Sequence, residues 1–242
     1  MQEIHLEPWE KIPEDFEKWL PIFEKSRKSE MPDEPEIGKF YRLTPKGCLS
    51  GNGKPFHGTM RLGNKPDKLL IFFGGGGGSW NEYTAARPNN LFTSHMKETY
   101  YFNDTEWMGD FLPSNGICAD REENPFLDWT MINIPYSTGD FHCGTGDFPY
   151  TALDNTRRIL PHHGYLNTMA ILRMAKRWVK SPKTLLIAGV SAGGFGVSLM
   201  AEDVIGEFSD CGNITCVVDG SLLLKEDWGR VAKEVWQSPE HI

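Results

Sequence analysis

One serine of this chain lies in a pattern that could make it a nucleophile. Ser191 is the central residue of Gly189-Val190-Ser191-Ala192-Gly193, with the aliphatic segment 184–188 before it and a helical stretch from Phe195 to about Glu202 after it. A strand, Gly-x-Ser-x-Gly and a helix in this order are typical of a nucleophile elbow, a sharp turn that exposes the hydroxyl. Because a serine hydroxyl attacks a carbonyl group only beside a base and hydrogen-bond donors, the pattern predicts acyl-transfer chemistry. The alternative is an ordinary glycine-rich turn.

Five consecutive glycines, Gly74 to Gly78, follow the apolar segment Leu69–Phe73. A glycine-rich turn after a strand either cradles a phosphate or offers backbone N–H groups to an oxyanion. No lysine follows the glycines, and Gly-x-Gly-x-x-Gly opening a helix does not fit, so neither phosphate pattern matches. In serine hydrolases of the α/β type, such a loop supplies one oxyanion donor, and the residue after the nucleophile, here Ala192, supplies another. We therefore expect the glycines to lie beside Ser191; a flexible linker is the alternative.

Polar residues between these motifs lie where they could approach a substrate. The segment 134–144 begins at the end of another apolar segment, on the edge of the sheet where sites of α/β proteins form. It contains Asp140 and His142, and we predict substrate contacts for both, and for Trp80 after the glycines. The alternative for Asp140 and His142 is a structural role, in which their hydrogen bonds fix a loop.

Apolar segments alternate with helical patterns along the chain. We expect a hairpin within residues 39–62 and strands at 69–73, 130–134, 184–188 and 214–218. Apolar residues recur every fourth position between 166 and 179, which predicts a helix facing the core. This alternation predicts an α/β fold, a mostly parallel sheet flanked by helices on both faces. The nucleophile-elbow pattern makes the expected fold α/β-hydrolase-like. We expect an N-terminal arm at 1–38 with a short helix at 13–25, a catalytic domain at 39–242, and an irregular insertion at 79–126.

The composition excludes several classes of protein. A hydrophobic content of 39% supports a single large folded domain, and a net charge of −8 argues against nucleic acid as a partner. No apolar run approaches the roughly 20 residues of a membrane span, and the polar N-terminus is not a secretory signal. We therefore expect a cytoplasmic protein, or a secreted one whose signal has been removed. The five cysteines form no Cys-x-x-Cys pair, so we expect neither a zinc site of that kind nor any cofactor; free thiols are favoured over a bridge between Cys211 and Cys216.

Five segments together carry a family resemblance. They are Phe72-Phe73-Gly74-Gly75-Gly76-Gly77, Glu123-Asn124-Pro125-Phe126, Ile134-Pro135-Tyr136-Ser137-Thr138-Gly139-Asp140, His163-Gly164-Tyr165 and Gly189-Val190-Ser191-Ala192-Gly193-Gly194. In this order they resemble the pectin acetylesterase and Notum-like carboxylesterases, over roughly residues 41 to 224. The resemblance implies that Ser191 is the nucleophile and that Gly76, Gly77 and Ala192 supply the oxyanion donors. The family removes acyl groups, such as acetate from plant polysaccharides or a fatty acyl group from a signalling protein.

We accordingly expect a carboxylic-ester hydrolase that forms a serine acyl-enzyme and acts on O-acetylated carbohydrate. One departure concerns the pocket: the family's glycine loop continues directly into Trp and Cys, whereas Gly78 and Ser79 precede Trp80 here. The acyl preference therefore does not transfer, and a lipase or thioesterase is an alternative. A catalytically silent homologue that binds an acyl group or a sugar is another.

The catalytic acid and base are the second departure. In this fold the chain order is serine, acid, histidine, and the candidates after Ser191 are Asp219 and His241, which lies next to the C-terminus. His142, His162 or His163 would require another order. The family's acid and histidine lie further downstream than this chain extends, so a missing C-terminal segment is the third possibility. The strand at 214–218 would then be a hydrophobic edge, covered by that segment, a partner chain or self-association.

Overall fold

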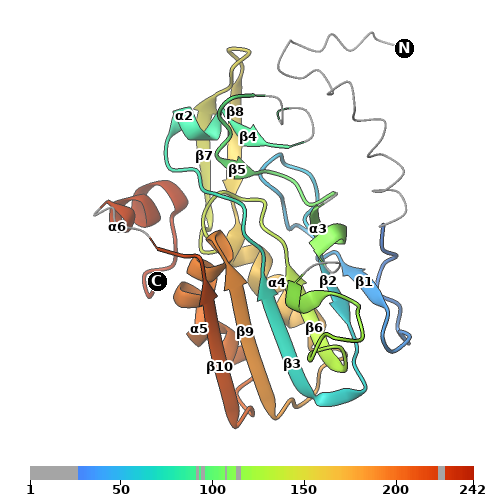
Figure 1. Ribbon diagram of the computed structural model, residues 1–242. Helices are drawn as coiled ribbons and strands as arrows, with labels where there is room; N and C mark the ends of the chain where they lie inside the picture. Colours follow the sequence, from blue (N-terminus) through green and yellow to red (C-terminus); the bar gives the residue numbers. More distant parts are fainter. Residues whose placement is uncertain (1–26, 91–92, 94–95, 107, 113–115, 223–226) are drawn as a thin grey trace, which may run out of the picture.

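The computed structural model describes residues 27–90, 93, 96–106, 108–112, 116–222 and 227–242 (Figure 1). The helix expected at 13–25 lies outside these residues. Residues 27–38, part of the expected N-terminal arm, lie against the domain, since Glu30 forms a β-bridge with Arg42. Among the described helices, none is long and apolar enough to cross a membrane. Nor do three or more His, Cys, Asp or Glu side chains gather there in a way that could hold a metal ion.

A six-stranded sheet forms the centre of the molecule. Its strands are β1 (Phe40–Leu43), β2 (Gly58–Arg61), β3 (Lys65–Phe73), β6 (Trp129–Ile134), β9 (Thr184–Val190) and β10 (Asn213–Asp219), in the spatial order β1-β2-β6-β3-β9-β10. The pairs β1–β2 and β2–β6 are antiparallel, and the other pairs are parallel. The sequence thus correctly predicts the hairpin, the four later strands and the mostly parallel pairing. The carboxyl ends of β3, β6, β9 and β10 meet at one edge, where a site can form.

Two long helices cover one face of this sheet. These are α4 (Gly164–Ala175) and α5 (Ala192–Glu207), seen behind the strands in Figure 1. Their apolar residues pack against inward-facing residues of β3, β6 and β9 to form the largest core cluster. The opposite face is covered differently from expectation: the segment around α3 (Met108–Phe111) and the 3₁₀ helix η2 (Gly116–Cys118) lies there, and Cys118 and Phe126 pack on Leu70 and Met131.

Two small sheets lie beyond the carboxyl edge of the large one. The strands β4 (Pro88–Asn89) and β5 (Tyr101–Phe102) pair in parallel, and β7 (Gly146–Thr151) and β8 (Arg157–His162) form a hairpin. The short helix α2 (Glu82–Ala85) lies beside them in Figure 1. Near the C-terminus, α6 (Trp228–Val231) continues into the π-helical turn η3 (Ala232–Trp236). The insertion expected at 79–126 therefore contains short regular elements, and the β7–β8 hairpin was not predicted.

The edge strand β10 is exposed along its whole length. All seven of its residues are exposed, including Val217 and Val218, each with 45% of its surface accessible. β10 pairs only with β9 within the described residues, so its outer backbone groups have no partner strand there. The expected hydrophobic edge is confirmed; what covers it stays a prediction.

A buried ion pair joins β1 to α3. The Arg42 guanidinium donates to both carboxylate oxygens of Asp110, and His57 Nε2 lies 3.5 Å from the same carboxylate. Burial alone would raise the pKa of Asp110, but the nearby His57, the hydrogen bonds from Arg42 and the arginine charge outweigh it and hold that pKa below its usual value.

Candidate active site

Ser191 occupies a strained turn between β9 and α5. Its φ of 53° and ψ of −122° lie in a region that residues with a β-carbon rarely adopt. Its N–H donates to the carbonyl oxygen of Asp219 at 2.8 Å, and its own carbonyl accepts from Ser221 Oγ at 2.6 Å. These bonds to the segment at the end of β10 hold the conformation in place, and Ser191 stays exposed. This is the backbone geometry of a nucleophile elbow.

The elbow packs tightly on itself and on the end of β3. A β-carbon at Gly189 would lie 2.2 Å from the carbonyl oxygen of Gly193, and one at Gly193 would lie 2.0 Å from the carbonyl oxygen of Phe73. Neither position has room for a side chain. The close approach of three backbone segments thus explains why glycine stands two residues before and two residues after Ser191.

The glycine stretch 74–78 meets the serine at its second residue. A β-carbon at Gly75 would lie 2.6 Å from the carbonyl oxygen of Val190 and 3.0 Å from Cβ of Ser191. The two motifs therefore lie side by side, as the sequence predicts. The stretch is fixed further along by β5, because Phe102 N–H donates to Gly76 O and Gly78 N–H donates to Tyr100 O, both at 2.9 Å.

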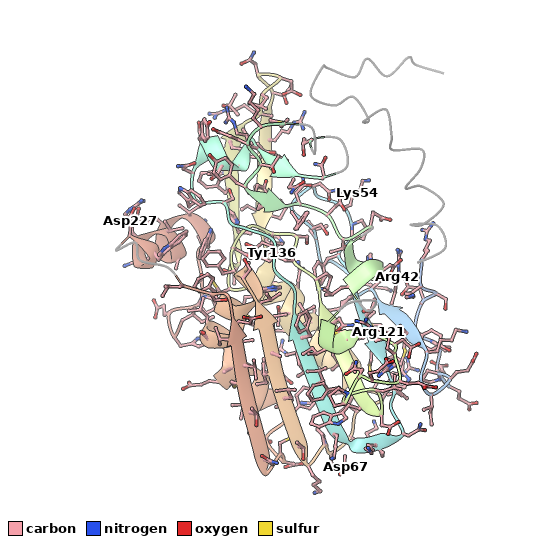
Figure 2. The ribbon with its side chains drawn as sticks, in the orientation of Figure 1. Arg42, Lys54, Asp67, Arg121, Tyr136 and Asp227 are labelled. Carbon is pink, nitrogen blue, oxygen red and sulfur yellow. The ribbon has the colours of Figure 1, made fainter. Side chains whose placement is uncertain are left out.

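The three predicted oxyanion donors have N–H groups that are not used elsewhere. Within the described part of the chain, the N–H groups of Gly76, Gly77 and Ala192 donate to no protein acceptor. For Ala192 this follows from its place at the start of α5, where the first N–H groups have no intrahelical partner. A β-carbon at Gly76 would lie 2.6 Å from the ring of Tyr136, which Figure 2 shows beyond the ends of the central strands. Free N–H groups at a helix start and an adjoining loop can stabilise negative charge.

Asp140 and His142 are buried, and their hydrogen bonds join the segment 138–144 to Gly74 and Gly164. The Asp140 carboxylate accepts hydrogen bonds of 2.7–3.2 Å from the Thr138 hydroxyl and from three backbone N–H groups. His142 Nε2 lies 2.9 Å from the Gly74 carbonyl oxygen, which can only accept, so this nitrogen carries the proton. Burial lowers the pKa of His142. With exposed fractions of 0% and 2%, these residues have almost no surface for a substrate. The geometry favours the structural alternative.

The two candidates for the rest of a triad lie apart from each other. Asp219 is joined to Ser191 through its backbone carbonyl. His241 Nε2 contacts the Asp203 carboxylate at 3.0 Å. Asp203 stands 12 residues after Ser191, about 18 Å along α5 at 1.5 Å per residue. His162 Nδ1 donates to Thr138 O, and no histidine in the described ranges bonds to Ser191. The structure thus does not bring Ser191 and His241 together.

A wall of aromatic rings flanks the elbow. Phe195, one helical turn after Ser191, stacks on Phe141 with ring centroids 4.6 Å apart, and Phe141 lies 5.2 Å from Trp228 of α6. Trp228 also meets the half-buried Trp80 at 5.8 Å. Trp80 thus belongs to this wall, and its contact with a substrate stays a prediction. Sequence reasoning missed Trp228; a tryptophan among the charged residues of 225–234 was the available signal.

Comparisons with known proteins agree with this geometry. Residues 44–236 match the family model of pectinacetylesterase. Two crystal forms of the Wnt deacylase Notum from Drosophila have similar folds, each with a TM-score of 0.57. Their sequences are 19% and 18% identical to this one over 82% and 83% of this chain. The aligned region makes up 61% and 60% of those chains, so this chain spans about three fifths of their length. Because the family model matches most of the sequence, the chain belongs to the pectinacetylesterase family.

Proposed function

We propose that this chain carries the nucleophile of a serine carboxylic-ester hydrolase that removes acetyl groups from O-acetylated carbohydrate. The observation that carries the proposal is the exposed Ser191, held in an elbow beside a glycine loop with unused N–H groups. Membership of the pectinacetylesterase family supports an ester as the substrate.

The reaction follows from the positions of these groups. Ser191 Oγ attacks the ester carbonyl carbon while its proton passes to a base. The carbonyl oxygen becomes an oxyanion that accepts hydrogen bonds from Gly76, Gly77 and Ala192. The bond to the alcohol then breaks, the base returns the proton to the alcohol, and an acyl-enzyme remains. A water molecule attacks the acyl-enzyme in the same way and releases the carboxylic acid and Ser191.

The base is the part of the proposal that the described residues do not supply. Each candidate histidine has another partner. His142 donates to Gly74 O and His162 to Thr138 O, while His163 and His241 contact the carboxylates of Asp147 and Asp203. The proposal therefore requires a base from outside the described residues. A catalytically silent homologue, which binds an ester without cleaving it, is the second candidate, and the lack of a described histidine at Ser191 is the observation that favours it.

Hydrolysis of p-nitrophenyl acetate and labelling by a fluorophosphonate probe separate the two candidates. We expect turnover and labelling by the native protein, and loss of both in Ser191→Ala. Ser198→Ala is the matched control, because Ser198 is exposed on the same helix and bonds only to the Gly194 carbonyl oxygen. A native protein that neither turns over the ester nor reacts with the probe would overturn the hydrolase and favour the silent homologue.

A further inference from the structure

A cavity of about 330 Å³ lies beyond the glycine loop and does not include Ser191. One wall is the β7–β8 hairpin, a second is the β4–β5 segment, and a third is the turn that contains Asn52 and Lys54. Figure 2 labels Lys54 beside β5. The volume suits a ligand of one or two small rings.

Unused hydrogen-bonding groups line the floor of this cavity. Asn103 and Tyr150 are buried, with exposed fractions of 9% and 8%. The side-chain oxygen of Asn103 accepts from Asn90 Nδ2 at 3.1 Å. Its amide nitrogen and the Tyr150 hydroxyl make no hydrogen bond to any other residue. Because these two groups line the cavity and have no protein partner among the described residues, they can bind hydroxyl groups of a ligand.

Apolar groups and balanced charges make up the rest of the lining. Ala86, Pro88, Ala152 and Leu153 supply small apolar surfaces. They suit the C–H faces of a ring that carries hydroxyl groups.

The charges around the cavity cancel. Two cations, Lys54 and Arg158, stand against two carboxylates, Asp104 and Asp154, and Arg158 forms an ion pair with Asp154. Burial raises the pKa of Asp104, and the charge of Lys54 opposes that rise. The lining thus has no net charge to attract an ion, and the buried Asp104 Oδ1 has no hydrogen-bond donor beside it among the described residues. A neutral ligand with hydroxyl groups fits this lining better than an anion.

β5 connects the cavity to the candidate active site. Phe102 N–H donates to Gly76 O, and Asn103, the next residue, lines the cavity. At about 3.3 Å per extended residue, the floor of the cavity lies within roughly two residues of the glycine loop. This is the length of one or two sugar rings.

We propose that this cavity is a subsite for one uncharged sugar unit of a saccharide chain whose acylated unit lies at Ser191. The position of the reacting ester rests on the proposed function, whereas the binding of a sugar by the cavity does not. The sugar's hydroxyl oxygens accept from Asn103 Nδ2 and the Tyr150 hydroxyl, and its C–H face packs on Ala152 and Leu153.

Binding by the full chain carrying Ser191→Ala tests the subsite without turnover. Xylotetraose and mannotetraose are titrated by calorimetry, with tetragalacturonate as the charged comparison. We expect at least one neutral tetrasaccharide to bind more tightly than tetragalacturonate. Adding Tyr150→Phe, which keeps the ring and removes one hydroxyl, is expected to weaken binding about three- to tenfold, and Asn103→Ala is expected to do the same. Asn64→Ala, an exposed turn residue between β2 and β3, is the control and leaves binding unchanged.

Absence of binding by both neutral saccharides, tighter binding of tetragalacturonate, or an equal loss from Asn64→Ala would overturn the subsite. Sugar binding that responds to Tyr150→Phe, in a protein that a fluorophosphonate does not label, would leave the subsite in place and remove only the proposed hydrolase.

Discussion

The strain at Ser191 makes an unusual prediction: removing its β-carbon stabilises the protein while removing the nucleophile. Ser191 has a φ of 53° and a ψ of −122°, a combination that glycine adopts freely and other residues do not. The backbone bonds that hold the turn, to Asp219 and from Ser221, do not involve the Ser191 side chain. Ser191→Gly therefore keeps these bonds and relieves the strain.

The expected gain follows from two opposing effects. A residue held in such a region costs about 1–3 kcal/mol in the folded state. Glycine also gives the unfolded chain more freedom, which costs about 0.4–1 kcal/mol relative to alanine. The net increase in the free energy of unfolding for Ser191→Gly over Ser191→Ala is thus about 1 kcal/mol, or about 2–4 °C in Tm for a domain of this size.

Urea and thermal unfolding of the native protein and three variants measure this difference. Ser191→Ala keeps the β-carbon and the strain, so its stability stays within about 0.5 kcal/mol of the native value. Ser198→Gly, in the interior of the same helix, is expected to lower the free energy of unfolding by about 0.5 kcal/mol, which is the opposite sign. Equal unfolding free energies for the glycine and alanine variants at position 191 would refute the reasoning.

Four further predictions concern other parts of the fold. Gly75→Ala places a methyl group against Ser191 and should lower kcat for p-nitrophenyl acetate about 10²–10³-fold, whereas Gly206→Ala, which meets nothing within 4 Å, should not; equal rates would contradict this. Asp140→Asn replaces a carboxylate that accepts four hydrogen bonds by an amide with only one acceptor oxygen, and should lower the free energy of unfolding in urea by about 3 kcal/mol. A loss below about 0.5 kcal/mol would argue against this structural role. Asp110 has a folded pKa below its unfolded value, so its stabilisation is present above the unfolded pKa and is lost as pH falls through the folded one. Asp110→Asn should lower the free energy of unfolding by about 3 kcal/mol at pH 7, and this difference from the native protein should shrink below about pH 4. Equal differences at both pH values would argue against the ion pair. Val217→Lys on the exposed edge should reduce self-association measured by sedimentation, and a native chain that is already monomeric would exclude self-association through β10.

The central strands could be predicted from the sequence because their signals are local. β3, β9 and β10 each contain a run of apolar residues, and glycines of the candidate site stand at the ends of β3 and β9. The start of α5 is less clear, since glycine is a poor helix former and the first turn contains Gly193 and Gly194. The helix nevertheless begins at Ala192. Its first turn packs so closely on β3 and on the segment after β10 that only glycine fits at Gly193 and Gly194, and this packing outweighs their low helix propensity.

The β7–β8 hairpin could not be predicted in the same way. Pro149 and Pro161 lie within its strands, and proline normally argues against a strand. A two-stranded sheet tolerates them because each strand has one edge without a partner. Asn155, with a φ of 63°, marks the turn. The pair Asp154-Asn155 was only a weak sequence signal for it, because neither residue is followed by glycine.

The sequence predicted which backbone segments meet at the candidate site but not which polar side chains face it. A run of glycines indicates that another backbone segment packs closely against it, so the two glycine motifs predict their contact with each other. Asp140 and His142 give no comparable indication. A carboxylate or an imidazole looks the same in the sequence whether it bonds to a substrate or to other residues of the chain. Only the folded geometry shows that both have protein partners.

The exposed edge of the sheet and the unfinished chemistry of Ser191 are connected through one hydrogen bond. Ser191 N–H donates to the carbonyl of Asp219, the last residue of β10, and β10 is the strand whose outer edge has no partner among the described residues. A strand that pairs with β10 in parallel lies two strand spacings, roughly 10 Å, from β9, the strand that leads into Ser191. The turn that follows such a strand can carry polar side chains toward Ser191. Coverage of the edge and supply of the base are for this reason expected to depend on the same interaction. A substitution such as Val217→Lys, which disturbs only the edge, should then lower fluorophosphonate labelling of Ser191 although it leaves the elbow itself intact.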